Sequence, residues 1–286
     1  MDVGLFEFAE FGENGGVERK GELLGYNHPM YHSLTVADIR RILKVPDSYK
    51  VDHLIVAGTN SRPKEHPYLY EALERIGRSY KEEVIEDSFF GEIKSLVVAG
   101  KRIWFDVAYG TAYLSEVVHV ASMLGSQANI LIGSCGALND TLISGDTIIP
   151  TVSFGNESST RMYQRENNSF LYFSDKKLSS SIEERVNNRK TVVGGKLMTV
   201  QAMLAETKED VDLWNKEGYI GVDMESATVF AVSGHFNVPA AALLYVADNL
   251  IKNELVTDGA YQLLRPQRIA LKKGNYESVL RMLIEE

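Results

Sequence analysis

Two hydrophobic patterns alternate along this chain. Short apolar runs bounded by turn residues are typical of buried strands, and apolar residues that recur every three or four positions are typical of helices. The predicted strands span 53–58, 94–100, 102–110, 128–136, 146–154, 190–200, 219–225 and 240–248. The predicted helices span 34–44, 67–86, 113–124, 175–187, 206–217, 225–236 and 266–285. Strands that alternate with helices predict an α/β protein.

Two polar stretches fall outside this alternation. Residues 1–30 carry six acidic side chains, and we interpret them as a possible N-terminal extension of a single domain that spans 1–286. Residues 156–170 form the longest predicted loop, and long ordered loops in compact enzymes often belong to the active site. Within the helical segments, Ser115 and Thr207 are candidate helix starts.

Composition narrows the class of protein. The chain has 286 residues, of which 44% are hydrophobic, so it can bury a full core. It contains no apolar stretch long enough to span a bilayer, and its acidic start differs from a signal peptide, so we expect a cytoplasmic protein. The single Cys135 excludes an internal disulfide and a thiolate cluster for zinc. A net charge of -9 argues against nucleic-acid or membrane partners.

Small residues end one predicted strand, in the sequence ILIGSCGALND at 130–140. The backbone N–H groups of Gly133 and Gly136 and the hydroxyl of Ser134 could approach an anion or a sugar there, which is where open α/β sheets bind ligands. A tight turn would use the same glycines, and spacing alone does not decide between the two. Cys135 fits a small buried filler better than a nucleophile.

Carboxylates follow two further strands. Asp223 and Glu225 flank Met224 where a strand meets a helix, and a carboxylate there could accept hydrogen bonds from a vicinal diol. A helix start that favours acidic residues explains them equally well. Asp248 ends the apolar run AALLYVAD, where burial would raise its pKa and suit it to donate a proton. An ordinary cap of the next loop is the alternative.

The order of these segments resembles the nucleoside phosphorylase family, which includes bacterial purine nucleoside phosphorylase, uridine phosphorylase and methylthioadenosine nucleosidase. GSCGA, GVDMESA and VADN follow one another as they do in that family. HLIVAGTNSR is similar to the family's strand and phosphate loop, with Gly58 and Arg62 at matching positions. YHSLT is similar to the segment in which a His of one subunit reaches its neighbour's ribose, which matches His32. The resemblance covers roughly residues 31–250.

The resemblance implies a single α/β domain with a mixed, partly barrel-like central sheet flanked by helices. It also implies a homodimer or hexamer with shared active sites. In the ribose site, Glu225 would hold the hydroxyls, Met224 would pack under the sugar and the neighbour's His32 would contact the 5' side. Asp248 would protonate purine N7 as the bond breaks.

For the co-substrate, the resemblance implies that Gly58, Arg62 and Ser134 bind inorganic phosphate, with no metal and no other cofactor. Met203 lies near the family's base-stacking position, although a core role is equally compatible with a Met. The loop from Glu157 to Tyr163 could close over the base.

Two departures from the family concern phosphate. Leu131 stands where the phosphorylases have an Arg, and the neighbour's second Arg, expected near Phe89, has no counterpart between Arg78 and Arg102. Each lost guanidinium removes charge-assisted bonds worth about 1.5 to 3 kcal/mol. Other cations could substitute, namely Lys64, Lys94, Arg102 and Arg161. The residues that could assist Asp248 are Arg265 and Arg268.

The expected activity is therefore phosphorolysis of a purine nucleoside, which gives the free base and pentose 1-phosphate. The retained Arg62 favours phosphate, whereas Leu131 favours a hydrolytic nucleosidase on the same fold. A nucleoside-binding protein without catalysis is the third hypothesis.

Overall fold

The computed structural model describes residues 30–87, 91–186 and 192–285. The chain divides into two compact units, residues 1–35 and 36–286. Of the first unit, the described part contains a 3-10 helix, η1 (Tyr31–Ser33). The possible extension at 1–30 lies almost entirely outside the described residues, and so does Phe89. All elements below belong to the second unit.

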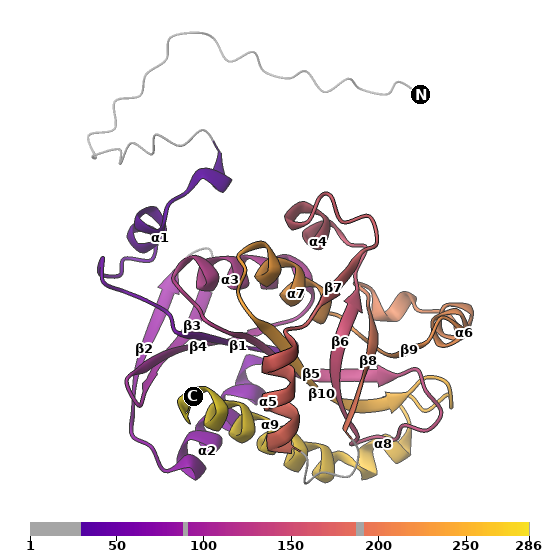
Figure 1. Ribbon diagram of the computed structural model, residues 1–286. Coiled ribbons are helices and arrows are strands. Elements are labelled where there is room, and N and C mark those ends of the chain that lie inside the picture. The colour runs from indigo at the N-terminus through magenta and orange to yellow at the C-terminus, as the bar shows by residue number, and fades with distance from the viewer. Residues whose placement is uncertain (1–29, 88–90, 187–191, 286) are drawn as a thin grey trace, which may run out of the picture. The chain divides into compact units, whose positions relative to one another are not determined.

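The described residues of this unit form one ten-stranded sheet in the order β10-β6-β8-β9-β5-β1-β4-β3-β2, with β7 paired to β6 (Figure 1). Because β10 also pairs with β5, the five strands from β10 to β5 close on themselves. Parallel and antiparallel pairs both occur. The mixed, partly barrel-like α/β fold is thus confirmed. The strands are β1 (His53–Gly58), β2 (Tyr80–Asp87), β3 (Gly91–Val98), β4 (Lys101–Ala108), β5 (Asn129–Ala137), β6 (Thr147–Phe154), β7 (Leu171–Phe173), β8 (Val192–Thr199), β9 (Tyr219–Asp223) and β10 (Ala240–Asn249).

Helices cover both faces of the sheet. In Figure 1, α3 and α7 lie together on one face, and α2, α5 and α9 lie on the other. No helix among the described residues combines the length and the apolar character that crossing a membrane requires. The helices are α1 (Val36–Ile42), α2 (Arg62–Ile76), α3 (Thr111–Met123), α4 (Ser158–Tyr163), α5 (Lys176–Val186), α6 (Lys208–Lys216), α7 (Ser226–His235), α8 (Gly259–Leu263), α9 (Arg265–Glu285) and the 3-10 helix η2 (Met203–Ala205).

The central strands have apolar residues at almost every position because both of their faces are covered. β1 is parallel to β4 and to β5, and β5 is parallel to β10. The carboxyl ends of these four strands therefore meet at one edge of the sheet, where ligands bind in open α/β folds. Gly58 ends β1, Gly133 and Ser134 follow the last β5 residue that pairs with β1, and Asp248 lies near the end of β10.

One predicted helix is wrong in its second half. The apolar spacing predicts a helix over 67–86, but α2 begins earlier, at Arg62, and ends at Ile76. Gly77 adopts a φ of 66°, a left-handed conformation that ends a helix. The following residues form β2, whose eight residues all pair with β3.

The helix starts had mixed outcomes. Thr207 is confirmed as the N-cap of α6, where it forms a capping box with Asp210. Ser115 is wrong as a start, since α3 begins at Thr111, directly after Gly110 with its φ of 75°. The predicted loop at 156–170 contains the short helix α4.

Candidate active site

The carboxyl group of Glu225 lies at the ends of β1 and β4, although Glu225 itself precedes α7. Its Oε1 accepts the backbone N–H of Gly110 at 2.9 Å. A Cβ atom added to Gly58 would stand 3.1 Å from Glu225 Oε2, so only glycine leaves the carboxyl this much room. The structure therefore brings the predicted phosphate-loop glycine and the predicted ribose carboxylate into direct proximity.

The surroundings of Glu225 disfavour its charge. Burial, followed by the nearby charge of Asp223, raises the pKa of Glu225 to about 8, against the opposing effect of the Gly110 N–H. The Leu131 side chain is fully buried, and its Cδ1 would lie 3.3 Å from the same added Cβ on Gly58. An apolar side chain thus lines the wall beside Gly58 where the family's phosphorylases carry an Arg.

Asp223 faces different partners from Glu225. It accepts hydrogen bonds from the Thr199 hydroxyl at 2.7 Å and from the Ser226 N–H at 2.9 Å. Burial raises its pKa to about 6. Asp223 therefore ties the start of α7 to β8, and Glu225 is the carboxyl that faces the strand ends.

Asp248 is a second carboxyl group whose pKa is raised. It is half-buried at the end of β10, and a Cβ on Gly136 of β5 would stand 3.3 Å from its Oδ1. Burial raises the pKa of Asp248 to about 6. Glu206, which follows η2, has its pKa raised to about 7 by burial and by the charge of Asp248. Sequence reasoning missed Glu206, because no motif includes it.

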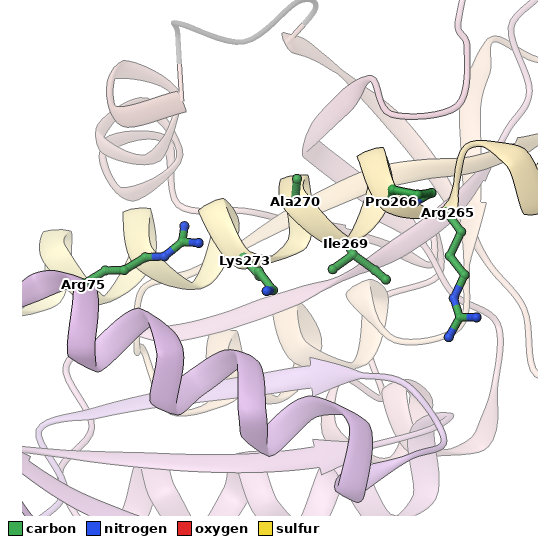
Figure 2. Close-up of a pocket in the computed structure, with 6 residues that line it drawn as sticks. All are labelled: Arg75, Arg265, Pro266, Ile269, Ala270 and Lys273. Carbon is green, nitrogen blue, oxygen red and sulfur yellow. The ribbon is translucent and has the colours of Figure 1, made fainter.

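Of the two arginines that could assist Asp248, Arg268 is the one that influences it. Arg268 is buried, donates to the Ser144 hydroxyl and the Tyr261 carbonyl, and its charge lowers the pKa of Asp248. Arg265 instead lines a surface groove between α2 and α9 together with Arg75 and Lys273 (Figure 2). None of the predicted site residues lines that groove.

The guanidinium of Arg62 is already paired within the fold. Its Nη2 donates to Asp106 Oδ1 at 3.2 Å and to the Tyr113 hydroxyl at 3.0 Å. Tyr113 also donates to Asp106 Oδ2, and the Val107 N–H donates to Oδ1 at 2.7 Å. Burial raises the pKa of Asp106, whereas these hydrogen bonds and Arg62 lower it. The Arg62 Nε is buried without a partner.

Ser134 and Gly133 point to opposite faces of β5, as successive strand residues do. Gly133 is the one near Gly58, because a Cβ on it would stand 3.8 Å from the Gly58 Cα. Ser134 lies beside Tyr245 in the strand register and hydrogen-bonds with its side chain. The structure thus gathers Gly58, Gly133 and Glu225, and directs the Ser134 hydroxyl toward Tyr245.

The segment around η2 reaches the surface. Met203 is 45% exposed, so the core alternative for this residue is wrong. Gln201 accepts the Thr111 hydroxyl at 3.1 Å and donates to the carbonyl of half-buried Met224 at 3.3 Å. Gln201 therefore links the start of α3 to the residue before Glu225, and no sequence motif indicates this link.

The start of α4 is anchored from the same side. Glu157 accepts the N–H groups of Ser159 and Thr160, and also the Thr228 hydroxyl of α7 at 3.1 Å. Closure of Glu157 to Tyr163 over a base stays a prediction. So does the ribose contact of His32, which belongs to the first unit.

Three of the four candidate replacement cations are engaged elsewhere. Lys94 pairs with Glu82 and Glu92, Arg102 pairs with Glu83, and Arg161 lies over the Phe170 ring. Lys64 is exposed. In the described part of the chain, no three His, Cys, Asp or Glu side chains cluster as a metal site would need.

The fold is that of nucleoside phosphorylases and nucleosidases. Uridine phosphorylase from Vibrio fischeri superposes with a TM-score of 0.65 at 19% identity, covering 85% of this chain and 93% of its own. The 5'-methylthioadenosine/S-adenosyl homocysteine nucleosidase of Campylobacter jejuni superposes with a TM-score of 0.64 at 17% identity, covering 82% of this chain and 100% of its own.

The chain belongs to the phosphorylase superfamily, whose family model matches residues 75–263. Members of this superfamily are enzymes that act on nucleosides. The guanosine phosphorylase of Halorubrum lacusprofundi is 23% identical over 80% of this chain and 90% of its own length. A DeoD-type purine nucleoside phosphorylase of Vibrio cholerae is 24% identical over 53% of this chain and 64% of its own length.

Proposed function

We propose that this enzyme cleaves the N-glycosidic bond of a purine nucleoside with inorganic phosphate as the nucleophile, releasing the base and pentose 1-phosphate. The observation that carries the proposal is a pair of carboxyl groups with raised pKa values, one at the end of β1 and one near the end of β10, which are two strands that both pair with β5. Glu225 and Asp248 have pKa values of about 8 and about 6. Groups of this kind cluster at catalytic sites, where proton transfer near neutral pH requires them.

The two carboxyls suit the two needs of this reaction. As the glycosidic bond stretches, the sugar gains oxocarbenium character and the base gains negative charge. Asp248 retains a proton up to a pH of about 6 and more weakly above it, so it can donate to purine N7. Ionised Glu225 accepts hydrogen bonds from ribose O2' and O3', and its negative charge favours the cationic sugar. Met224 packs under the sugar and exposed Met203 contacts the base.

Phosphate as the nucleophile is supported by the retained Gly58 and Arg62, and by relatives that are named phosphorylases. The Arg62 Nε is buried without a hydrogen-bond partner, so the fold leaves one of its donors unused. In the proposed enzyme, His32 of a second copy completes the ribose site, so the active form is a homodimer or a hexamer.

Hydrolysis on the same site is the second candidate. It is favoured by the Leu131 wall and by the Arg62–Asp106 ion pair at 3.2 Å, which leave little positive charge for phosphate. Water needs no such charge. The bond-breaking groups would keep the same roles.

Product analysis tests both candidates. Purified protein is incubated with inosine or guanosine, with and without phosphate, and free base, ribose and ribose 1-phosphate are quantified. Phosphorolysis predicts base release that rises with phosphate and yields ribose 1-phosphate. Equal rates without phosphate and free ribose as the product would establish hydrolysis instead. Absence of base release under both conditions would refute cleavage and leave nucleoside binding without catalysis.

A further inference from the structure

A buried carboxylate interrupts the most apolar part of β4. Asp106 is 1% exposed and directly follows Trp104 and Phe105, which are fully buried. An ionised carboxylate at such a position lowers stability unless donors and a cation compensate it. Asp106 receives both, from the Val107 N–H, the Tyr113 hydroxyl and the Arg62 guanidinium. Such a residue in an otherwise apolar strand calls for a reason beyond packing.

The position of Asp106 gives that reason. In the strand register, Asp106 lies opposite Val56, two residues before Gly58, at the end of β1. Tyr113, which holds both Asp106 and Arg62, is in the first turn of α3. Gly110, immediately before α3, holds the carboxyl of Glu225. One turn of the chain therefore positions both the Arg62–Asp106 pair and the candidate ribose carboxylate.

We infer that Asp106 sets the phosphate affinity of this site by neutralising the Arg62 guanidinium. The inference rests on the proposed function only in taking Arg62 as the phosphate ligand. A phosphate that binds Arg62 is also repelled by the Asp106 carboxylate, whose Oδ1 lies 3.2 Å from Arg62 Nη2. Because Asp106 is buried, water screens its charge only weakly. Leu131 adds no charge. Phosphate therefore binds weakly, and water competes with it as the nucleophile.

The substitution Asp106→Asn tests this inference, because Asn has nearly the same shape as Asp but carries no charge. The Asn Oδ1 can still accept from Arg62 Nη2, so the guanidinium keeps a partner while one negative charge disappears. Phosphate titrated calorimetrically into nucleoside-free protein should bind about tenfold more tightly or better in the variant. With nucleoside present, the ratio of pentose 1-phosphate to free pentose should rise by a similar factor.

Two matched variants isolate the charge. Tyr113→Phe removes a hydrogen bond from both Arg62 and Asp106 without changing any charge, so phosphate affinity should change by less than about threefold. In the double variant Asp106→Asn/Arg62→Met the gain should vanish, because the cation that Asp106 opposes is gone. A gain that survives the loss of Arg62 would refute the inference.

Unchanged or weaker phosphate binding in a folded Asp106→Asn variant would also refute it, and would show that Asp106 only positions Arg62. If Asp106→Asn does not fold, Asp106→Ser removes the same charge with a smaller polar side chain and must give the same gain. Because binding is measured without nucleoside, the result is independent of catalysis. Tighter phosphate binding in a variant whose parent cleaves no nucleoside would support the inference and refute the proposed function.

Discussion

The two ends of the candidate site differ in the charged groups that they contain and in how those charges are balanced. At the sugar and base end, Glu225 and Asp248 are carboxyls whose burial raises their pKa values to about 8 and about 6. At the nucleophile end, the Arg62 charge is balanced by Asp106, and Leu131 lines the wall beside Gly58. In the proposed mechanism, bond cleavage and the choice of nucleophile therefore depend on different side chains, and substitutions can test the two separately.

Asp248→Asn tests the base end of the site and should have the strongest effect on catalysis. Loss of the proton donor should lower kcat by about 10²- to 10⁴-fold, the usual contribution of general acid catalysis. Nucleoside affinity should change little, because the side chain keeps its size. Steady-state kinetics with a purine nucleoside measure both, and Asp140→Asn, at an exposed position, is the control. A kcat within a factor of about two of the parent would remove Asp248 from the chemistry.

The sugar end is tested by Glu225→Gln. The amide can accept only at its oxygen, so binding of a ribonucleoside should weaken by about 1.5 to 3 kcal/mol, the value of a hydrogen bond to a charged group. Binding of the 2',3'-dideoxy analogue should hardly change. Competition titrations with the two ligands give the comparison. Equal losses for both ligands would show that Glu225 does not bind the diol.

The same substitution should stabilise the empty protein in alkaline solution. The pKa of Glu225 is raised from 4.5 to about 8, so the native state holds this proton more tightly than the unfolded state does. Ionisation therefore costs stability, increasingly as pH rises from about 4.5 to about 8. Glu225→Gln removes that cost, about 2 kcal/mol or more at pH 8, since one pKa unit is worth about 1.4 kcal/mol. Thermal melts at pH 5 and pH 8 should show a gain only at pH 8, and a gain of equal size at both would contradict the charge argument.

The pH dependence of kcat/KM tests the protonation states of Asp248 and Glu225 together. Catalysis needs protonated Asp248, whose pKa is about 6, and ionised Glu225, whose pKa is about 8. Between pH 6 and pH 8, deprotonation of Asp248 lowers the active fraction as much as deprotonation of Glu225 raises it, so kcat/KM should be flat. Below pH 6 and above pH 8, kcat/KM should fall. In Asp248→Asn, the remaining activity should rise up to pH 8 and stay level above it. A decline above pH 8 in that variant would assign the alkaline limb to another group.

The sequence predicted the central strands well because burial on both faces gives β1, β5 and β10 continuous apolar runs. It failed at β2, where the charged segment from Tyr80 to Asp87 suits an exposed helix as well as a strand. Pairing with β3, which is a tertiary interaction, decides that case.

For the candidate site, the order of short segments pointed to Gly58 and Glu225, and the structure places them side by side. The Arg62–Asp106 pair could not be predicted, since its members are 44 residues apart and meet only once α2 and β4 have packed. The sole local sign was a charged residue inside the apolar run RIWFDVA. Side-chain direction, as for Ser134, also depends on the folded register.

The most direct test of the account measures the products from one purine ribonucleoside as the phosphate concentration is raised. The account predicts that Asp248→Asn slows base release by about 10²-fold or more at every concentration, while the ratio of pentose 1-phosphate to free pentose in the parent rises with phosphate. Base release in Asp248→Asn within a factor of about two of the parent rate, or a pentose 1-phosphate yield of zero at saturating phosphate, would contradict it.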